Sequence, residues 1–220
     1  MLVKDCMKRH PILISPSMPA SEAQQIMFDN KIRHLPVAGE GKRIEGVITR
    51  QRLAMKPTDL ASLNVWEITR MLGNMKVRDI MIKKDQVITI SGDKTIERAA
   101  KIMTENKIGC LPVLEDDQKT VMGILTETDL LLAFQAILGL PSPGVRVTVR
   151  MPDKTGEFNK LSTVLAQNGW GVMGIGSFPS PRHPGYYEVV IKIPHLTVEE
   201  VRNVLSQVEG QEIADIREGF

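Results

Sequence analysis

The chain has 220 residues, enough for one large domain or two to three small ones, and its 42% hydrophobic and 25% charged residues are ordinary for a globular protein. A net charge of +2 and 4% aromatic residues disfavour nucleic acid or an anionic membrane as the main partner. The charged start at Lys4 and Asp5 disfavours a signal peptide, and the longest apolar run, 130–140, is about half a membrane span. Two cysteines suit a reducing compartment. We therefore expect a cytoplasmic protein without a membrane or nucleic-acid partner.

The first 137 residues contain a duplicated pattern. Four ordered matches carry it: Val3–Met7 with Val77–Met81, Ala23, Met27 and Asn30 with Ala99, Met103 and Asn106, Lys31–Val37 with Lys107–Val113, and Gly46–Arg52 with Gly123–Asp129. The offset between the copies grows slowly along the chain, as small insertions in surface loops would produce. Ordered matches of this kind indicate an internal repeat.

Each copy is expected to form strand, helix, strand, strand and helix. In the first copy the strands are 11–14, 35–38 and 44–48, with a hairpin turn at 39–42 and Ser17 as the cap of the first helix. The second copy, 77–136, repeats this order, with Asp93 in the capping position. A unit this small buries little core, so the copies are expected to pack on each other. Between them, 60–75 predicts an amphipathic connector helix that contains Trp66.

The segment Gly123–Asp129 has the pattern of a short buried strand followed by a turn that caps the next helix. We expect Thr128 to be the cap, with the hydroxyl of Thr126 and the carboxylate of Asp129 close by. A helix N-terminus can hold a phosphate, and a carboxylate one turn along can accept hydrogen bonds from a ribose diol. An ordinary capped turn has the same spacing, and the repetition of the pattern is what favours a nucleotide site.

The doubled pattern, with its Leu-Pro-Val strand and its Gly-x-x-Thr-x-x-Asp ending, resembles a tandem pair of CBS domains, the Bateman module, over residues 1–137. The resemblance implies a pseudo-symmetric unit with two clefts, frequent dimerisation, and binding of an adenosine-containing ligand such as AMP, ADP, ATP or S-adenosylmethionine. It implies phosphate contacts for Thr126 and ribose contacts for Asp129. It also implies that the adenine lies near Thr89, Ile90, Ile108, Gly109 and Cys110.

The first copy departs from this pattern, because Thr49 is kept but Arg52 replaces the acid. A guanidinium has no acceptor for the hydrogen bonds of a diol. Three possibilities stay open: an empty first cleft, a cleft for a different anion, or basic side chains that reach the phosphates of a ligand in the second cleft. The side chains in question are Arg33, His34, Arg50 and Arg52. Solvated positions at a helix start are favoured for Arg50 and Arg52, whereas for Arg33 and His34 the solvated position and the phosphate contact stay equally open. We therefore expect one full nucleotide site rather than two.

The segment 139–144 is a Pro/Gly linker, and 145–220 has the order β-α-β-β-α-β of a ferredoxin-like sandwich. The expected strands are 145–150, 172–178, 186–193 and 213–216, and Thr197 with Glu200 forms a capping box before the second helix. The turn at Asp153–Gly156, followed by Leu161, Leu165 and Gly169, resembles an ACT domain. This resemblance implies an amino acid or small metabolite at Asp153 and Gly156, with a pure subunit-pairing role as the alternative.

The sequence contains no motif for catalysis or metal binding. The four histidines lack a metal-ligand spacing, Cys6 and His10 lack further ligands nearby, and neither a nucleophile elbow nor a Walker loop occurs. Cys110 is more typical of a small buried filler than of a nucleophile. We therefore expect no enzyme, no metal and no catalytic cofactor.

The predicted fold class is α+β, a tandem CBS pair followed by a ferredoxin-like ACT domain. The predicted domains are 1–55, a connector at 56–76, 77–138, the linker at 139–144, and 145–220. This order resembles the bacterial AcuB-type proteins of acetoin utilisation. We expect a homodimeric regulatory sensor of an adenosine-containing nucleotide, with an unknown downstream protein target. The alternative is a non-catalytic interaction module with vestigial clefts.

Overall fold

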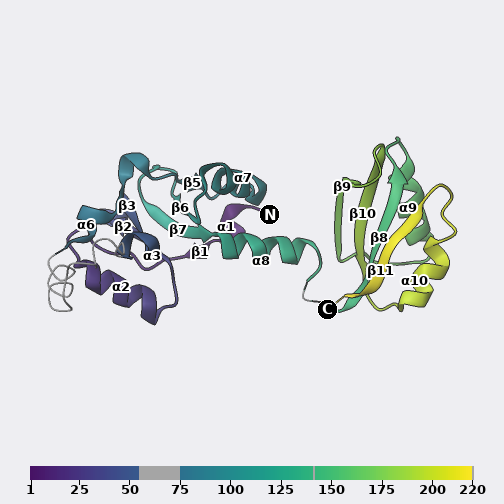
Figure 1. The fold of residues 1–220 in the computed structure, drawn as a ribbon, viewed down its shortest axis with the longest axis horizontal. Helices are drawn as coiled ribbons and strands as arrows, with labels where there is room; N and C mark the ends of the chain where they lie inside the picture. Colours follow the sequence, from purple (N-terminus) through teal and green to yellow (C-terminus); the bar gives the residue numbers. More distant parts are fainter. Residues whose placement is uncertain (55–74, 141, 220) are drawn as a thin grey trace. The chain divides into compact units, whose positions relative to one another are not determined.

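The computed structural model describes residues 1–54, 75–140 and 142–219, which divide into two compact units, Met1–Leu130 and Leu131–Phe220 (Figure 1). The predicted connector helix, apart from Met75, lies outside the described residues. Within the described ranges, no helix has the length and apolar character needed to cross a membrane.

The first unit contains both copies of the repeat, apart from the residues of the last helix that follow Leu130. The first copy consists of α1 (Val3–Cys6), β1 (Lys8–Arg9), α2 (Ala20–Asp29), β2 (His34–Ala38), the 3-10 helix η1 (Glu40–Lys42), β3 (Ile44–Thr49) and α3 (Arg50–Leu53). The second consists of α6 (Val77–Ile80), β4 (Ile82–Lys83), the 3-10 helix η2 (Lys84–Gln86), β5 (Ile90–Ser91), α7 (Ile96–Asn106), β6 (Cys110–Leu114), β7 (Val121–Thr126) and α8 (Glu127–Ile137). The shared order of short helix, short strand, helix, hairpin and helix confirms the duplication.

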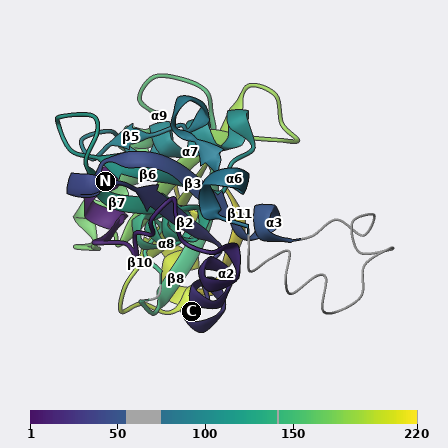
Figure 2. The same cartoon turned by 90° about the vertical axis from the view of Figure 1, so that its left-hand side faces the viewer.

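The two copies exchange their first strands. The sheet of the second copy has the order β1-β7-β6-β5, with Lys8 of the first copy opposite Ile124, and the sheet of the first copy has the order β2-β3-β4, with Ile82 of the second copy opposite Val47. Figures 1 and 2 show α2 and α7 on opposite sides of these strands. The expectation that the copies pack on each other is therefore confirmed, and backbone pairing joins them.

The glycine that opens each Gly-x-x-Thr motif makes this exchange possible. A Cβ atom on Gly46 would lie 2.5 Å from the carbonyl oxygen of Ile82, and one on Gly123 would lie 2.5 Å from Sδ of Met7 and 3.1 Å from the carbonyl oxygen of Lys8. These separations are shorter than a van der Waals contact, so only glycine admits the partner strand here.

Three local expectations for the first unit are wrong. Residues 11–14 form no strand. The first strand, β1, ends at Arg9, and within 11–14 only Ile14 makes an isolated bridge. Pro19 and not Ser17 stands at the start of α2, where no side-chain cap forms. Thr95 and not Asp93 caps α7, since its Oγ1 accepts the backbone N–H of Arg98 at 3.3 Å, while the Asp93 carboxylate pairs with Lys4 Nζ at 2.7 Å.

The second unit contains β8 (Gly144–Pro152), α9 (Glu157–Gln167), β9 (Gly174–Pro179), β10 (Tyr186–Ile193), α10 (Val198–Leu205) and β11 (Glu212–Gly219). Its sheet is antiparallel throughout, in the order β11-β8-β10-β9. Buried Leu161 of α9 and Leu205 of α10 pack on Val147 and Ile191 of the sheet, so both helices cover one face. The expected element order and the capping box of Thr197 with Glu200 are confirmed. The last strand is longer than predicted, because a bulge between Ile213 and Asp215 interrupts its alternation.

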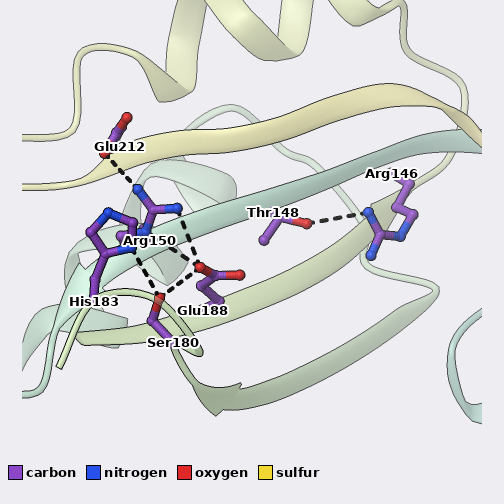
Figure 3. Close-up of polar contacts among 7 residues, drawn as sticks. All are labelled: Arg146, Thr148, Arg150, Ser180, His183, Glu188 and Glu212. Carbon is purple, nitrogen blue, oxygen red and sulfur yellow. Dashed lines mark hydrogen bonds and ion pairs between the residues drawn. The ribbon is translucent and has the colours of Figure 1, made fainter. Parts of the chain in front are cut away.

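The other face of this sheet carries a network of charged side chains (Figure 3). Arg150 donates to Glu188 Oε1 at 3.3 Å and to Glu212 Oε2 at 3.0 Å, and Ser180 Oγ donates to Glu188 Oε1 at 2.8 Å. The side chains of Arg150 and Glu188 are only 17% and 14% exposed. Such a paired, part-buried group holds the start of the β9–β10 loop against the sheet, and His183 Nδ1 lies 3.4 Å from Ser180 Oγ in that loop.

Candidate functional site

Two clefts in the first unit are related by the repeat. The first, which we call the Asp129 cleft, has a volume of about 250 Å³. Its walls are the segment around β1, including Lys8 and Ile12, the turn between α2 and β2 at 31–34, and the junction of β7 with α8, including Thr126 and Asp129. Both copies therefore contribute to it.

The second, which we call the Arg52 cleft, is larger, with a volume of about 740 Å³. Its walls are the segment after β4, including Val87, the turn between α7 and β6 at 107–110, and the junction of β3 with α3, including Thr49 and Arg52. These are the repeat equivalents of the walls of the Asp129 cleft, and they too come from both copies.

At the start of α8, Thr126 and Asp129 cap the helix together. Asp129 Oδ2 accepts the backbone N–H of Thr126 at 2.7 Å and its hydroxyl at 2.6 Å, while Thr126 Oγ1 accepts the backbone N–H of Asp129 at 3.4 Å. The expected cap at Thr128 is therefore wrong, because α8 already begins at Glu127. This reciprocal arrangement fixes the carboxylate at the mouth of the cleft.

The sequence-predicted site residues fall into both clefts. Thr126 and Asp129 line one cleft, whereas Thr49, Arg52 and the residues Ile108, Gly109 and Cys110 line the other. Ile90 is buried in β5, and its neighbours Val87 and Ile88, not Thr89 and Ile90 themselves, reach the Arg52 cleft. The residues that the sequence assigned to one nucleotide site therefore line two different clefts, and the strand exchange places residues of the first copy beside Thr126.

Arg33 and His34 line both clefts. Arg50 and Arg52 line only the Arg52 cleft. Of the four basic residues considered above, Arg33 and His34 are therefore the two that can reach a ligand beside Asp129. Burial is the main cause that lowers the pKa of His34, and the charge of Arg33 lowers it further, against an opposing effect of Glu127. The imidazole is therefore mostly neutral at pH 7.

Gly109 makes room for the side chains between the clefts. A Cβ atom on this residue would lie 3.1 Å from Cε1 and Nε2 of His34 and 3.2 Å from Oε2 of Glu127. The group that lies closest to Gly109 in this structure is the His34 ring.

Two lysines that the sequence reading did not single out as site residues occupy equivalent positions. Lys31 and Lys107 follow α2 and α7 in the left-handed conformation, each with φ of 53°, and each lines one cleft. Glycine is preferred at such positions because other residues are strained there. A lysine at this position in both copies indicates a use for its charge. The alignment of Lys31 with Lys107 in the repeat is the sequence feature that could have identified these two lysines as site residues.

Cys110 is expected to be chemically inert in the folded protein. Burial, aided by the charge of Glu127, raises the pKa of its thiol from 9.0 to about 12, which lowers the thiolate fraction at pH 8 about 1,000-fold. We expect the Cys6→Ser variant to react with Ellman's reagent at least 100-fold more slowly when folded than in urea. Equal rates in the two states would contradict the burial of Cys110.

In the second unit, the predicted loop joins β8 to α9. Gly156 is the N-cap residue of α9, with φ of 93°, and the backbone N–H of exposed Asp153 donates to the carbonyl oxygen of Gly185 at 2.8 Å. A Cβ atom on Gly156 would meet nothing within 4 Å, so the space above this loop is open. In the part of the chain that the structure describes, no group of three or more His, Cys, Asp or Glu side chains could hold a metal ion.

Two strand-exchanged repeats with a pair of equivalent clefts define a tandem-repeat, two-cleft module. The family model for the CBS domain matches residues 3–57 and 77–136, and the chain belongs to the CBS-domain family.

Similar proteins cover the same part of the chain. The sequence is 32% identical over 129 residues to a homoserine O-acetyltransferase from Methanosalsum zhilinae, a match of 58% of this chain and 23% of that protein. The chain spans less than half the length of the first two curated relatives it matches. The CBS domain pair of protein MJ0100, solved with 5′-methylthioadenosine and S-adenosyl-L-methionine, is 28% identical, with a TM-score of 0.50 over 61% of this chain and 95% of that one. AcuB from Vibrio cholerae is 25% identical, with a TM-score of 0.50 over 61% of this chain and 90% of that one.

Proposed function

We propose that the CBS pair is a regulatory sensor that binds an adenosine-containing ligand, such as AMP, ADP, ATP or S-adenosylmethionine, in the Asp129 cleft. The observation that carries this proposal is the capping pair of Thr126 and Asp129 at the start of α8, with three cationic side chains around it: Lys8, Lys31 and Arg33. The CBS pair of MJ0100, which was solved with two adenosyl compounds, supports the same class of ligand.

We assign the ribose, the anionic group and the adenine of the ligand to different residues of the cleft. Asp129 uses Oδ2 for Thr126, so Oδ1 is the acceptor that we assign to the ribose diol. The N-terminus of α8 and the cations of Lys31 and Arg33 suit a phosphate or carboxylate. The half-buried side chain of Ile32 and the exposed side chain of Ile12 offer apolar surface to the adenine ring.

Binding would act on the arrangement of the two repeats. Because the walls of the cleft come from both copies, a ligand that contacts both favours one relative orientation of the copies. A difference in ligand affinity between two such orientations is the free energy available for regulation. The protein itself then needs no catalytic residue, and its target is a downstream protein.

For the second unit, we propose a ferredoxin-like ACT domain, supported by its βαββαβ order and its sheet order. Asp153 and Gly156 would hold an amino acid or small metabolite, or the domain would pair two subunits of a homodimer. The similarity to AcuB from Vibrio cholerae supports a place beside acetoin utilisation, and a cytoplasmic location stays a prediction.

The second candidate function is a non-catalytic interaction module with vestigial clefts, which the loss of the acid at Arg52 favours. Isothermal titration of the full chain with AMP, ADP, ATP, S-adenosylmethionine and the common amino acids separates the two candidates. Saturable binding of one adenosyl compound is expected for a sensor. Binding of amino acids alone would move the function to the second unit, and no binding to a folded chain would overturn the sensor in favour of the interaction module.

A further inference from the structure

We propose that the Arg52 cleft binds a nucleotide whose ribose carries a phosphate on its 2′ or 3′ hydroxyl. The two clefts would then take two different ligands, one with a free ribose diol and one with a phosphorylated ribose. The inference rests on the proposed function only in that the CBS pair takes adenosine-containing ligands.

Arg52 occupies the position that corresponds to Asp129. Thr49 Oγ1 accepts the backbone N–H of Arg52 at 3.3 Å, as Thr126 Oγ1 accepts that of Asp129 at 3.4 Å. The strand register supports the same correspondence. Thr49 lies opposite His34, and Thr126 lies opposite Cys110, which is the repeat equivalent of His34. Arg52 therefore lies in the first turn of α3, as Asp129 lies in the first turn of α8.

The change from a carboxylate to a guanidinium replaces hydrogen-bond acceptors at this position with hydrogen-bond donors. A carboxylate accepts from both hydroxyls of a free diol, whereas a guanidinium presents donors only and leaves a diol without an acceptor. A phosphate on the ribose supplies acceptor oxygens in the spacing that a guanidinium binds in bidentate fashion. Dinucleotide-binding folds show the same exchange, with an acid for a free 2′-hydroxyl and an arginine for a 2′-phosphate.

The rest of the cleft fits a larger and more highly charged nucleotide. Arg50 and Lys107, which do not line the Asp129 cleft, add two cations to Arg52, enough for a second phosphate, against the single carboxylate of Glu127. The volume of about 740 Å³, compared with about 250 Å³ for the Asp129 cleft, leaves room for the additional group.

Apolar walls distinguish a nucleotide from a bare polyanion. Val47, Ile82, Val87 and Ile108 line the same cleft as the cations. An inorganic oligophosphate would leave this surface in contact with water, whereas a purine base would cover it. We therefore assign the base to the apolar side and the phosphates to the cationic side.

Isothermal titration of the full chain tests the assignment. The probes are adenosine 2′,5′-bisphosphate, adenosine 3′,5′-bisphosphate, AMP and pyrophosphate. Each is titrated into the wild type and into the variants Arg52→Asp, Asp129→Asn and Arg98→Asp. Arg98→Asp is the control, because the Arg98 side chain is exposed on α7 outside both clefts. The wild type is expected to bind one bisphosphate in the presence of saturating AMP. Arg52→Asp should weaken this binding by a factor of about 30 and create a second site for AMP. Asp129→Asn and Arg98→Asp should leave the bisphosphate affinity within about twofold.

Three results would overturn the inference. These are bisphosphate affinity unaffected by Arg52→Asp, pyrophosphate binding as tightly as the bisphosphates, or AMP saturating two sites in the wild type. Each of them leaves the sensor proposal standing, because AMP binding at the Asp129 cleft is measured separately through Asp129→Asn. If Arg52→Asp does not fold, as judged by circular dichroism, Arg52→Gln removes the same charge and serves in its place.

Discussion

Replacing Gly46 by alanine is expected to lower the free energy of unfolding of the first unit by about 2 kcal/mol. The new Cβ atom would lie 2.5 Å from the carbonyl oxygen of Ile82 and 2.7 Å from Sδ of Met81. The first of these atoms belongs to the backbone of the exchanged strand β4, which cannot rotate away as a side chain can. Relief therefore requires β3 and β4 to separate. Urea unfolding followed by circular dichroism measures the effect as a lower midpoint with an unchanged slope.

The control for this variant is Gly171→Ala. Gly171 is not among the glycines with positive φ, and the nearest atom to its Cβ position is Cγ of Pro194 at 3.9 Å. We expect a change within about 0.5 kcal/mol. If Gly46→Ala unfolds at the same urea concentration as Gly171→Ala, the close pairing of β3 with β4 is incorrect.

The second large effect is expected for Asp129→Asn, which should weaken binding of an adenosine-containing ligand 10- to 100-fold. The amide keeps the size of the side chain but replaces a charged acceptor, and hydrogen bonds to charged groups contribute about 1.5–3 kcal/mol. Because Asp129 Oδ2 also accepts from Thr126 in the first turn of α8, and the amide removes a negative charge near the helix N-terminus, the variant should lose about 0.3–1 kcal/mol of stability. Titration calorimetry at a temperature well below the unfolding midpoint separates the two effects.

Asp93→Asn is the matched control. Asp93 is a surface carboxylate of the same unit, paired with Lys4 Nζ at 2.7 Å and 68% exposed, outside both clefts. It changes the net charge as Asp129→Asn does, without touching the site. Equal affinities of the two variants for the ligand would exclude Asp129 as the ribose contact.

The sequence predicted the repeat, most of its elements and the order of the second unit, because these depend on local patterns. Alternating residues in Val145–Arg150 identify a strand, and the Gly-x-x-Thr spacing identifies the junction of strand and helix wherever it occurs. The exchange of β1 and β4 has no such pattern. Each strand has only two residues, Lys8–Arg9 and Ile82–Lys83, and their partners lie in the other copy.

The same exchange explains which parts of the candidate site escaped prediction. Thr126, Asp129, Arg33 and His34 could be predicted as candidates because they belong to a motif or to its repeat. Lys8 and Ile12 reach the Asp129 cleft only through the pairing of β1 with β7, which alignment of the copies cannot reveal. Alignment identifies equivalent residues, whereas the grouping of residues into clefts depends on how the copies associate.

The pairing of β1 with β7 and of β4 with β3 also bears on how such a duplicated chain can arise. A single copy would expose the strand edges of β3 or β7 that the other copy now covers, and an exposed edge is prone to recruit another chain. One repeat alone would complete its sheets by associating with a second identical chain, each lending its first strand to the other. The duplicated protein is equivalent to that strand-exchanged homodimer with its two chains joined end to end. Joining them turns a concentration-dependent assembly into an intramolecular one, and it frees the two clefts to diverge, as Asp129 and Arg52 have done.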